Sequence, residues 1–119
     1  MDKVNIAEKL SLFKDHWNPR IVEELNGQYV KLVKFQGAFV WHKHELEDEL
    51  FLVLSGQFNM EFRDRTVEIK ENEFIVVPRG IEHRPNAQNE VSVLLFEPKK
   101  TLNTGNRNGE LTRNELEWI

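Results

Sequence analysis

Four side chains with metal-binding chemistry stand out in the sequence. His42 and His44 are separated by one residue in the stretch FVWHKH, and Glu49 follows five residues later. His83 comes much further along, just after the turn VPRGI. In an extended strand, residues i and i+2 point to the same side, so the two neighbouring imidazoles project to one face. Imidazole nitrogens with one carboxylate oxygen are a natural donor set for a divalent first-row metal.

The absence of cysteine narrows the kinds of site that are possible. It excludes a disulfide framework, a Cys-based zinc site, an iron–sulfur cluster and a thiol nucleophile. Without sulfur donors, we expect iron, manganese, nickel, copper or a catalytic zinc rather than a structural zinc. An HxH pair alone is equally well explained as two polar residues on a solvent-facing strand, so the case depends on the other two side chains.

Short β-strands are the elements that must position these side chains. Residues 57–62 alternate apolar and polar side chains, which is the period of a half-buried strand, whereas residues 50–54 are apolar throughout and predict a strand covered on both faces. Many short strands at regular spacing favour an antiparallel sandwich or barrel. The seven β-like runs are 28–35, 38–44, 50–54, 57–62, 66–69, 74–77 and 91–96.

The two ends of the chain differ from this central region. Residues 4–17 predict an amphipathic helix, because apolar residues recur at spacings of four, three and four from Ile6 to Trp17. Residues 28–98 hold the strands. Residues 99–119 are mostly polar but end in Glu-Trp-Ile, so we expect this C-terminal segment to dock on the barrel or on a partner subunit.

The spacing of the candidate ligands resembles that of the cupin family. The stretch Gly37-x4-His42-x-His44-x4-Glu49-x6-Gly56 is similar to the first cupin motif, and Pro78-x-Gly80-x2-His83 is similar to the core of the second. The resemblance extends over residues 29–98. It implies an all-β fold, a double-stranded β-helix or jelly-roll barrel, here preceded by an α-helix. It also implies that the two histidines and the glutamate of the first motif hold one metal together with His83.

A few positions depart from the family pattern or leave alternatives open. Asn72 stands where a glycine usually opens the second motif, and asparagine also adopts left-handed turn geometry. Asp48 competes with Glu49 as the carboxylate ligand, but counting back six residues from Gly56 favours Glu49. Trp41 has the opposite parity to the histidines and is expected outside the barrel. The apolar residues of 57–62 either line the cavity or cover the sheet against the helix.

The family resemblance implies two forms of function. One is a metalloenzyme, an oxygenase or isomerase, that acts on a small organic molecule in the barrel with one divalent transition metal (iron, manganese, nickel or zinc). The alternative is a non-catalytic module that binds a small molecule or a metal. No catalytic residue is assigned, because no acid/base pair stands clear of the ligand set. Cupins commonly form homodimers, so a second copy of the chain is an expected partner, which the apolar ending at Trp118 fits.

Length and charge set the remaining expectations. A chain of 119 residues allows a single domain, residues 1–119. A formal net charge of −4 argues against wrapping nucleic acid or docking on an anionic membrane. The apolar runs are too short to span a bilayer, and the start MDKVNIAEKL lacks the apolar stretch of a secretory signal. We therefore expect a cytoplasmic protein without nucleic-acid or membrane partners.

Overall fold

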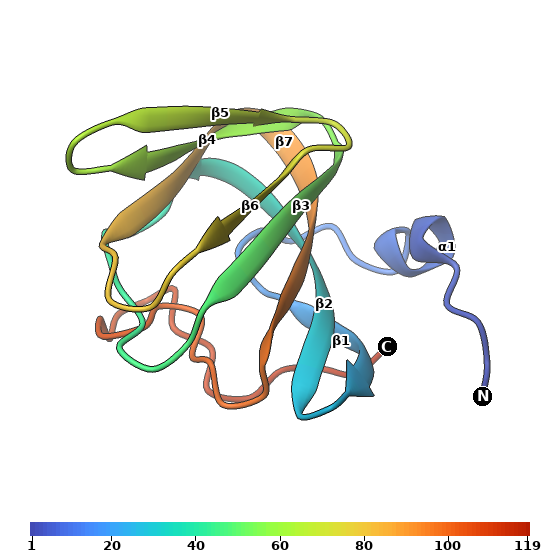
Figure 1. The fold of residues 1–119 in the computed structure, drawn as a ribbon. Coiled ribbons are helices and arrows are strands. Elements are labelled where there is room, and N and C mark those ends of the chain that lie inside the picture. The colour runs from blue at the N-terminus through green and yellow to red at the C-terminus, as the bar shows by residue number, and fades with distance from the viewer.

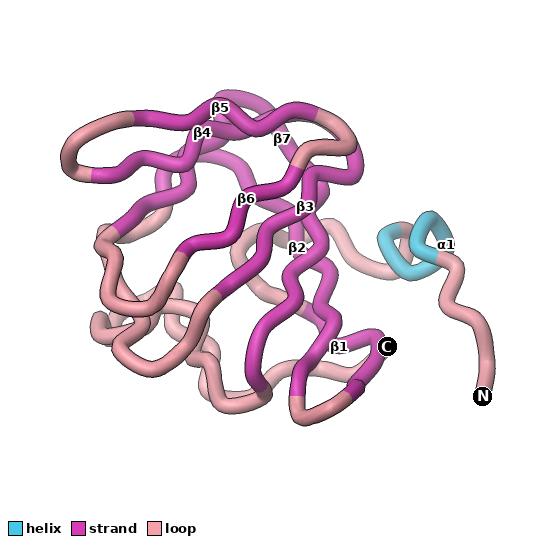
Figure 2. Tube along the Cα trace, viewed as in Figure 1, coloured by secondary structure: helices cyan, strands magenta, loops and turns pink.

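Antiparallel β-strands form the body of the computed structural model, which describes residues 1–119 (Figure 1; Figure 2). The predicted all-β jelly-roll barrel with an N-terminal helix is confirmed. Strand β1, which the sequence patterns did not predict, forms a hairpin with β2. The elements in chain order are α1 (Ile6–Leu10), β1 (Arg20–Leu25), β2 (Gln28–Ala38), β3 (Glu49–Ser55), β4 (Gln57–Phe62), β5 (Thr66–Lys70), β6 (Phe74–Val77) and β7 (His83–Pro98).

Strand β7 organises the sheet because it changes partners along its length. Its second half lies between β2 and β3, in the order β1-β2-β7-β3-β6. Its first residues, 83–86, pair instead with β4, which pairs in turn with β5. Figure 1 shows the β4–β5 hairpin closing one end of the barrel. The beginning of β7, where His83 stands, therefore lies at the junction between the two groups of strands.

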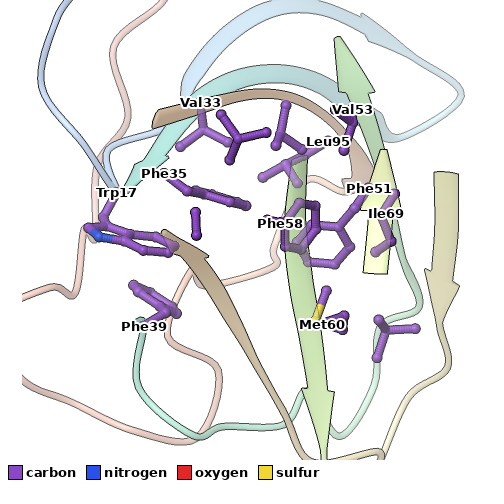
Figure 3. Close-up of a cluster of buried hydrophobic side chains, with 14 residues drawn as sticks. Trp17, Val33, Phe35, Phe39, Phe51, Val53, Phe58, Met60, Ile69 and Leu95 are labelled. Carbon is purple, nitrogen blue, oxygen red and sulfur yellow. The ribbon is translucent and has the colours of Figure 1, made fainter. Parts of the chain in front are cut away.

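Alternate residues of the strands point inward and form the hydrophobic core (Figure 3). Phe58 and Met60 belong to this core and are 2% and 0% exposed. This face of β4 therefore lines the interior of the barrel and does not pack against the N-terminal helix. Burial of one such side chain contributes about 1.5 to 3 kcal/mol to folding. The core cluster comprises Trp17, Val33, Phe35, Phe39, Phe51, Val53, Phe58, Met60, Ile69, Val77, Ala87, Val91, Val93 and Leu95.

The N-terminal helix is shorter than the predicted range of 4–17. It begins after the N-cap Asn5, whose side chain accepts a hydrogen bond from the Glu8 amide, and it ends at Leu10. Beyond that point the Lys34 ammonium group hydrogen-bonds the Leu10 and Phe13 carbonyls, so tertiary contacts replace helical ones. Trp17 is buried by the barrel and does not lie on a helical stripe. With five residues in its one helix, the chain has no helix of the length and apolarity that a bilayer crossing requires.

The outer side of β3 is not fully covered, in contrast to the prediction for residues 50–54. Leu50 and Leu52 are half-buried, and their partners Val76 and Phe74 on β6 are 48% and 61% exposed. Strand β7 contributes two more half-buried apolar residues beside them. We call this surface the outer apolar face, and it comprises Leu50, Leu52, Phe74, Val76, Leu94 and Phe96.

The C-terminal segment returns to the edge of the sheet and docks on its own barrel. Trp118 forms a parallel bridge with Ile21, and the main chain on either side of it exchanges two hydrogen bonds with Ile21, at 2.9 and 3.0 Å. The Trp118 ring packs edge-on against Tyr29, with ring centroids 5.6 Å apart. The edge of β1 is thereby covered at Ile21, where it is protected from pairing with another chain.

Candidate metal centre

The four predicted ligand side chains come together inside the barrel. His42 and His44 lie in the loop between β2 and β3, Glu49 begins β3, and His83 begins β7. One ligand atom from each residue lies within 4.8 Å of all the others. The four residues are between 0% and 4% exposed. Three segments far apart in the sequence thus form one buried cluster that could hold a metal.

Main-chain hydrogen bonds join the two motifs that carry these ligands. The His83 amide donates to the His42 carbonyl at 2.8 Å, the His42 amide donates to the His83 carbonyl at 3.1 Å, and the Gly80 amide donates to the His44 carbonyl at 2.7 Å. Gly80 has φ of +81°, a conformation that favours glycine. Residues 38–44 were expected to form a strand, but β2 ends at Ala38 and beyond it only an isolated bridge between His42 and His83 is present.

In two of the histidines, a main-chain carbonyl determines which ring nitrogen carries the proton. His42 Nδ1 lies 2.8 Å from the Val40 carbonyl oxygen, and His83 Nδ1 lies 2.8 Å from the Ile81 carbonyl oxygen. A carbonyl oxygen only accepts, so in the neutral rings Nδ1 carries the proton and Nε2 keeps its lone pair. Histidine ligands of metals are oriented by the same kind of hydrogen bond.

Several buried polar atoms of the cluster have no hydrogen-bond partner. The Glu49 carboxylate Oε1 lies 2.8 Å from His44 Nε2 and 3.3 Å from His83 Nε2. None of these three atoms makes a hydrogen bond, despite the short separations between them. Buried polar atoms without partners are rare because they lose their hydration without compensation. A cation among them would supply the missing partner, and the donor set therefore fits a metal.

The protonation states in the cluster also suit a metal. Burial lowers the pKa of His42 to about 4, with a further contribution from the neighbouring His83. Burial by itself raises the pKa of Glu49, but the neighbouring Glu97, His44 and His83 side chains outweigh it and hold that pKa well below its usual range. Near neutral pH the centre thus presents a neutral His42 imidazole and an ionised carboxylate, the forms that bind metals.

A buried ion pair beside the cluster was missed in the sequence. The Lys31 ammonium lies 2.8 Å from Glu97 Oε1, and the two side chains are 1% and 2% exposed. The other carboxylate oxygen of Glu97 has no hydrogen-bond partner. Burial and the neighbouring Glu49 charge raise the pKa of Glu97 well above its ordinary value, and Lys31 offsets this only in part.

Strand parity is the signal that identifies this pair. Glu97 continues the inward alternation of Val91, Val93 and Leu95 along β7, and Lys31 precedes Val33 by two residues on β2. A charged residue at an inward position of a barrel strand must find a partner inside the barrel. Applying the alternation to residues 91–97 would have placed Glu97 in the interior.

A small cavity adjoins the cluster. Its volume is about 30 Å³, which accommodates about two water molecules. The polar part of its wall includes His42, Glu49 and Glu97, and the remainder is largely aromatic, including Trp17 and Phe39. The cavity thus joins the candidate ligands to an apolar chamber.

The C-terminal segment fastens the loop that carries the two neighbouring histidines. The Lys43 amide donates to Asn106 Oδ1 at 2.9 Å, and the Asn106 amide donates to the Lys43 carbonyl at 3.1 Å. Gly105 lies so close that a Cβ atom there would stand 2.3 Å from the Lys43 carbonyl oxygen. No pattern in the sequence links residues 105–106 to this loop.

The structure also tests three predictions about residues outside the cluster. Asp48 points outward and accepts a hydrogen bond from the Arg79 amide at 2.8 Å, so Glu49 is the carboxylate in the cluster. Asn72 has φ of +67°, the left-handed geometry expected of it. Trp41 lies outside the barrel, where Arg63 stacks 3.8 Å from the centre of its ring.

Known proteins resemble this chain in sequence and in structure. The model of the cupin domain family matches residues 29–97. A crystal structure of a cupin-2 domain containing protein from Shewanella frigidimarina is 42% identical, with a TM-score of 0.80, over 81% of this chain and 94% of that one. Protein NMB1881 from Neisseria meningitidis is 31% identical, with a TM-score of 0.76, over 82% of this chain and 100% of that one.

One curated protein also matches part of the chain. The uncharacterized protein YdbB of Bacillus subtilis is 39% identical over 64 residues, which are 53% of this chain and 57% of that protein. The match therefore spans little more than half of either protein.

Proposed function

This chain belongs to the cupin domain family, and on that premise we propose that it binds one divalent transition metal through His42, His44, Glu49 and His83. The observation that carries the proposal is the convergence of four buried ligand atoms, several of which have no other partner. The main-chain carbonyls that accept from His42 and His83 support it further, because they turn the remaining nitrogen of each ring toward the cluster.

We propose further that the protein is a metalloenzyme, an oxygenase or an isomerase, that acts on a small organic molecule. Iron, manganese, nickel or zinc suits the donor set, and the bound metal would polarise a carbonyl, acidify a water or, as iron, activate oxygen. The chain's own part is to hold the three imidazoles and to exclude bulk water with an aromatic wall. Glu97 lines the same cavity without belonging to the cluster, so it offers a carboxyl group to a bound molecule.

Elemental analysis of the natively purified protein tests the metal proposal. We expect about one divalent metal per chain, and loss of that metal in His83→Ala, which removes one of four ligands. The matched control is His16→Ala, because His16 is partly exposed, pairs with the surface residue Glu90 and does not belong to the cluster. A wild-type protein that holds no more metal than His83→Ala, both as purified and after titration with metal, would overturn the proposal.

Turnover separates the enzyme from the alternative, a non-catalytic binding module. If the protein is an enzyme, we expect metal-dependent oxygen consumption or isomer formation. His83→Ala should abolish this activity while the variant remains folded. If the protein is a non-catalytic binding module, we expect saturable binding of a small molecule and no formation of product. Its supporting observation is the small size of the cavity, about 30 Å³, which leaves little room for a reacting pair.

We also propose that the protein is a homodimer. The supporting observation is the outer apolar face, where Phe74 and Val76 are 61% and 48% exposed beside four half-buried apolar residues. Light scattering at micromolar concentration should give twice the mass of the chain, and Phe74→Glu should give the mass of a monomer. A wild-type monomer under these conditions would contradict this part of the proposal.

A further inference from the structure

The indole of Trp17 occupies a flat slot between two phenyl rings. Its ring centre lies 4.5 Å from that of Phe35 and 4.6 Å from that of Phe39, with interplanar angles of 16° and 22°. Figure 3 shows the indole between the two phenyl groups. Nearly parallel rings at this spacing are the arrangement in which aromatic faces attract one another. The two phenyl rings therefore form a site that fits a single planar ring.

This slot adjoins the candidate metal centre. The Phe39 ring packs edge-on against the His42 imidazole, with centroids 5.3 Å apart. Trp17, Phe35 and Phe39 line the same cavity as His42 and Glu49. A ring placed in the slot would thus lie beside the cluster and could direct a substituent toward it.

The backbone of Trp17 is strained, unlike that of the other core residues. Its φ is +60°, in the left-handed region that bulky side chains rarely adopt. Such strain persists only where the surroundings impose it, and it concentrates at functional sites. The surroundings here are two hydrogen bonds, from the Trp17 amide to the Lys34 carbonyl at 2.9 Å and from its indole Nε1 to the Gln36 carbonyl at 3.0 Å.

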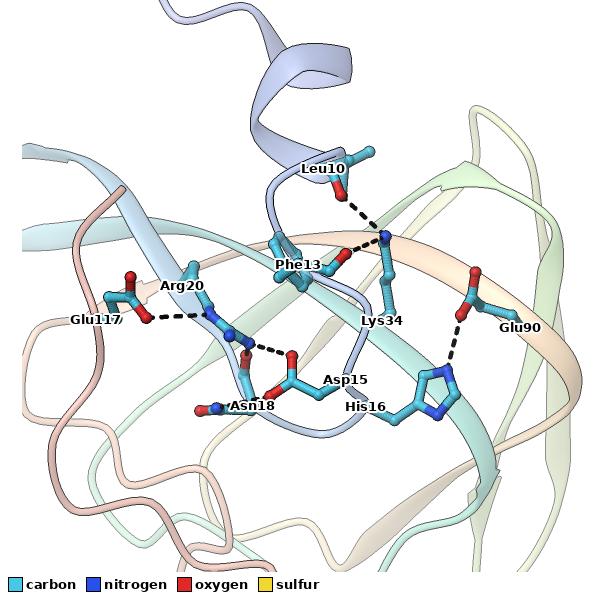
Figure 4. A network of polar contacts seen from close by, with 9 residues as sticks. All are labelled: Leu10, Phe13, Asp15, His16, Asn18, Arg20, Lys34, Glu90 and Glu117. Atoms are coloured by element: carbon cyan, nitrogen blue, oxygen red, sulfur yellow. Dashed lines mark hydrogen bonds and ion pairs between the residues drawn. The ribbon is translucent and has the colours of Figure 1, made fainter.

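The segment that carries Trp17 buries two side chains, Phe13 and Trp17, and its other contacts with the barrel are polar and lie near the surface (Figure 4). The Lys34 ammonium donates to the carbonyls of Leu10 and Phe13 at 2.9 and 2.7 Å, and the partly exposed His16 pairs with Glu90. Helix α1, which precedes the segment, has no buried residue. Water can replace these polar contacts, and no strand pairing is lost when residues 11–19 lift from the barrel, so the burial of Phe13 and Trp17 is what a ligand in the slot would have to offset.

From these observations we infer that the slot between Phe35 and Phe39 binds a planar aromatic or heteroaromatic ring, and that Trp17 fills this slot until such a ligand displaces it. The inference rests on the proposed function, because it identifies the class of molecule that enters the barrel beside the metal. A polar substituent of the ring would point toward His42 and Glu49. Trp17 is thereby a specificity-determining residue that closes the chamber to water when no ligand is bound.

Binding of indole to Trp17→Ala tests the slot directly. The variant removes the occupant and should bind indole at least about tenfold more tightly than the wild type, in which only the displaced fraction is competent. Trp118→Ala is the matched control, because it removes an indole from the edge of β1 and should bind like the wild type. Calorimetry on the metal-free full-length chain measures both affinities. A folded Trp17→Ala that binds indole no more tightly than the wild type overturns the inference.

A second variant and a second readout test the displacement itself. Lys34→Met removes the cation that fastens residues 10–13 and should raise the affinity for indole while leaving the slot intact. In the wild-type protein saturated with indole, the Nε1–H resonance of Trp17 should move to the position of an exposed indole. An unchanged resonance at saturation, or an unchanged affinity in a folded Lys34→Met, would contradict displacement.

These measurements separate the inference from the proposed function. Indole binds here without metal, so a failure of the metal analysis leaves the slot assignment standing. Conversely, the protein could hold one metal per chain while its Trp17→Ala variant takes up no indole. That result would support the metal proposal and contradict only the inference of an aromatic ligand.

Discussion

The interior of this barrel has two regions that are equally inaccessible to water but differ in chemistry. In the apolar region, Val53 and Met60 are completely buried, and their neighbours are other hydrocarbon side chains. In the region of the metal centre, His83 is also completely buried, yet its Nε2 atom lacks a hydrogen-bond partner. Burial stabilises the first region through the hydrophobic effect, whereas it costs free energy in the second. The apolar region therefore supports the fold, whereas the polar region carries buried atoms without partners that a bound cation would satisfy.

The largest effect is expected from a change in the apolar region. Met60→Ala leaves a cavity where the side chain was completely buried, and it should lower the free energy of unfolding by about 2 to 5 kcal/mol. The loss should be the same with and without metal, because Met60 is not part of the centre. Urea unfolding measures it. Leu46→Ala is the matched control, since Leu46 is 77% exposed and its truncation should change stability by less than about 0.5 kcal/mol.

A smaller effect should appear when pH is lowered on the metal-free protein. The pKa of His42 is about 4 in the folded state against 6.5 in an unfolded chain. Between these two values the unfolded chain binds a proton at this residue and the folded chain does not, so stability falls as pH drops from 6.5 to 4. The shift corresponds to about 3 kcal/mol, with no contribution from His42 above pH 6.5 or any further change below pH 4.

Two histidine variants test whether this pH dependence of stability comes from His42. His42→Asn should flatten the pH dependence of stability between pH 4 and 6.5, whereas the surface variant His16→Asn should preserve it. Urea unfolding of the three metal-free proteins at several pH values gives the comparison. A slope that survives His42→Asn unchanged would assign the effect to other groups.

The smallest of these effects concerns the ion pair at the border of the two regions. Lys31→Met removes the cation beside Glu97 and should cost about 2 kcal/mol in the free energy of unfolding, because a buried carboxyl loses its partner. Replacing both members, in Lys31→Met with Glu97→Leu, should restore much of that loss, as neutral side chains pack well in such places. If the double variant were as unstable as the single one, the pair would be needed for the packing itself.

The candidate metal centre could be predicted from the sequence because the four side chains of the cluster stand at fixed spacings in two motifs. His42, His44, Glu49 and His83 all appear in the cluster. Lys31 and Glu97 were missed because no motif contains them, although strand parity identifies both as inward residues. The role of Gly105 against Lys43 follows only from a contact between segments 62 residues apart.

In the fold, too, features set by local sequence patterns were predicted and features set by long-range contacts were missed. The alternation in residues 57–62 predicted β4 with its observed bounds. Strand β1 was missed because its sequence, RIVEEL, alternates poorly, although Asn26 and Gly27 after it form the left-handed turn typical of a hairpin. The helix expected over 4–17 ends at Leu10, because burying Phe13 and Trp17 against the barrel outweighs continued helical hydrogen bonding.

Residue types and local periodicity were enough to predict the kinds of candidate ligand atom, their spacing and most of the strands of the barrel. The folded structure was needed to show that β7 brings His83 beside His42, that Lys31 reaches Glu97 and that Trp17 fills the slot between two phenyl rings. Contacts of this kind join segments far apart in the chain, and they form only where burial of the whole barrel outweighs the entropy of bringing those segments together.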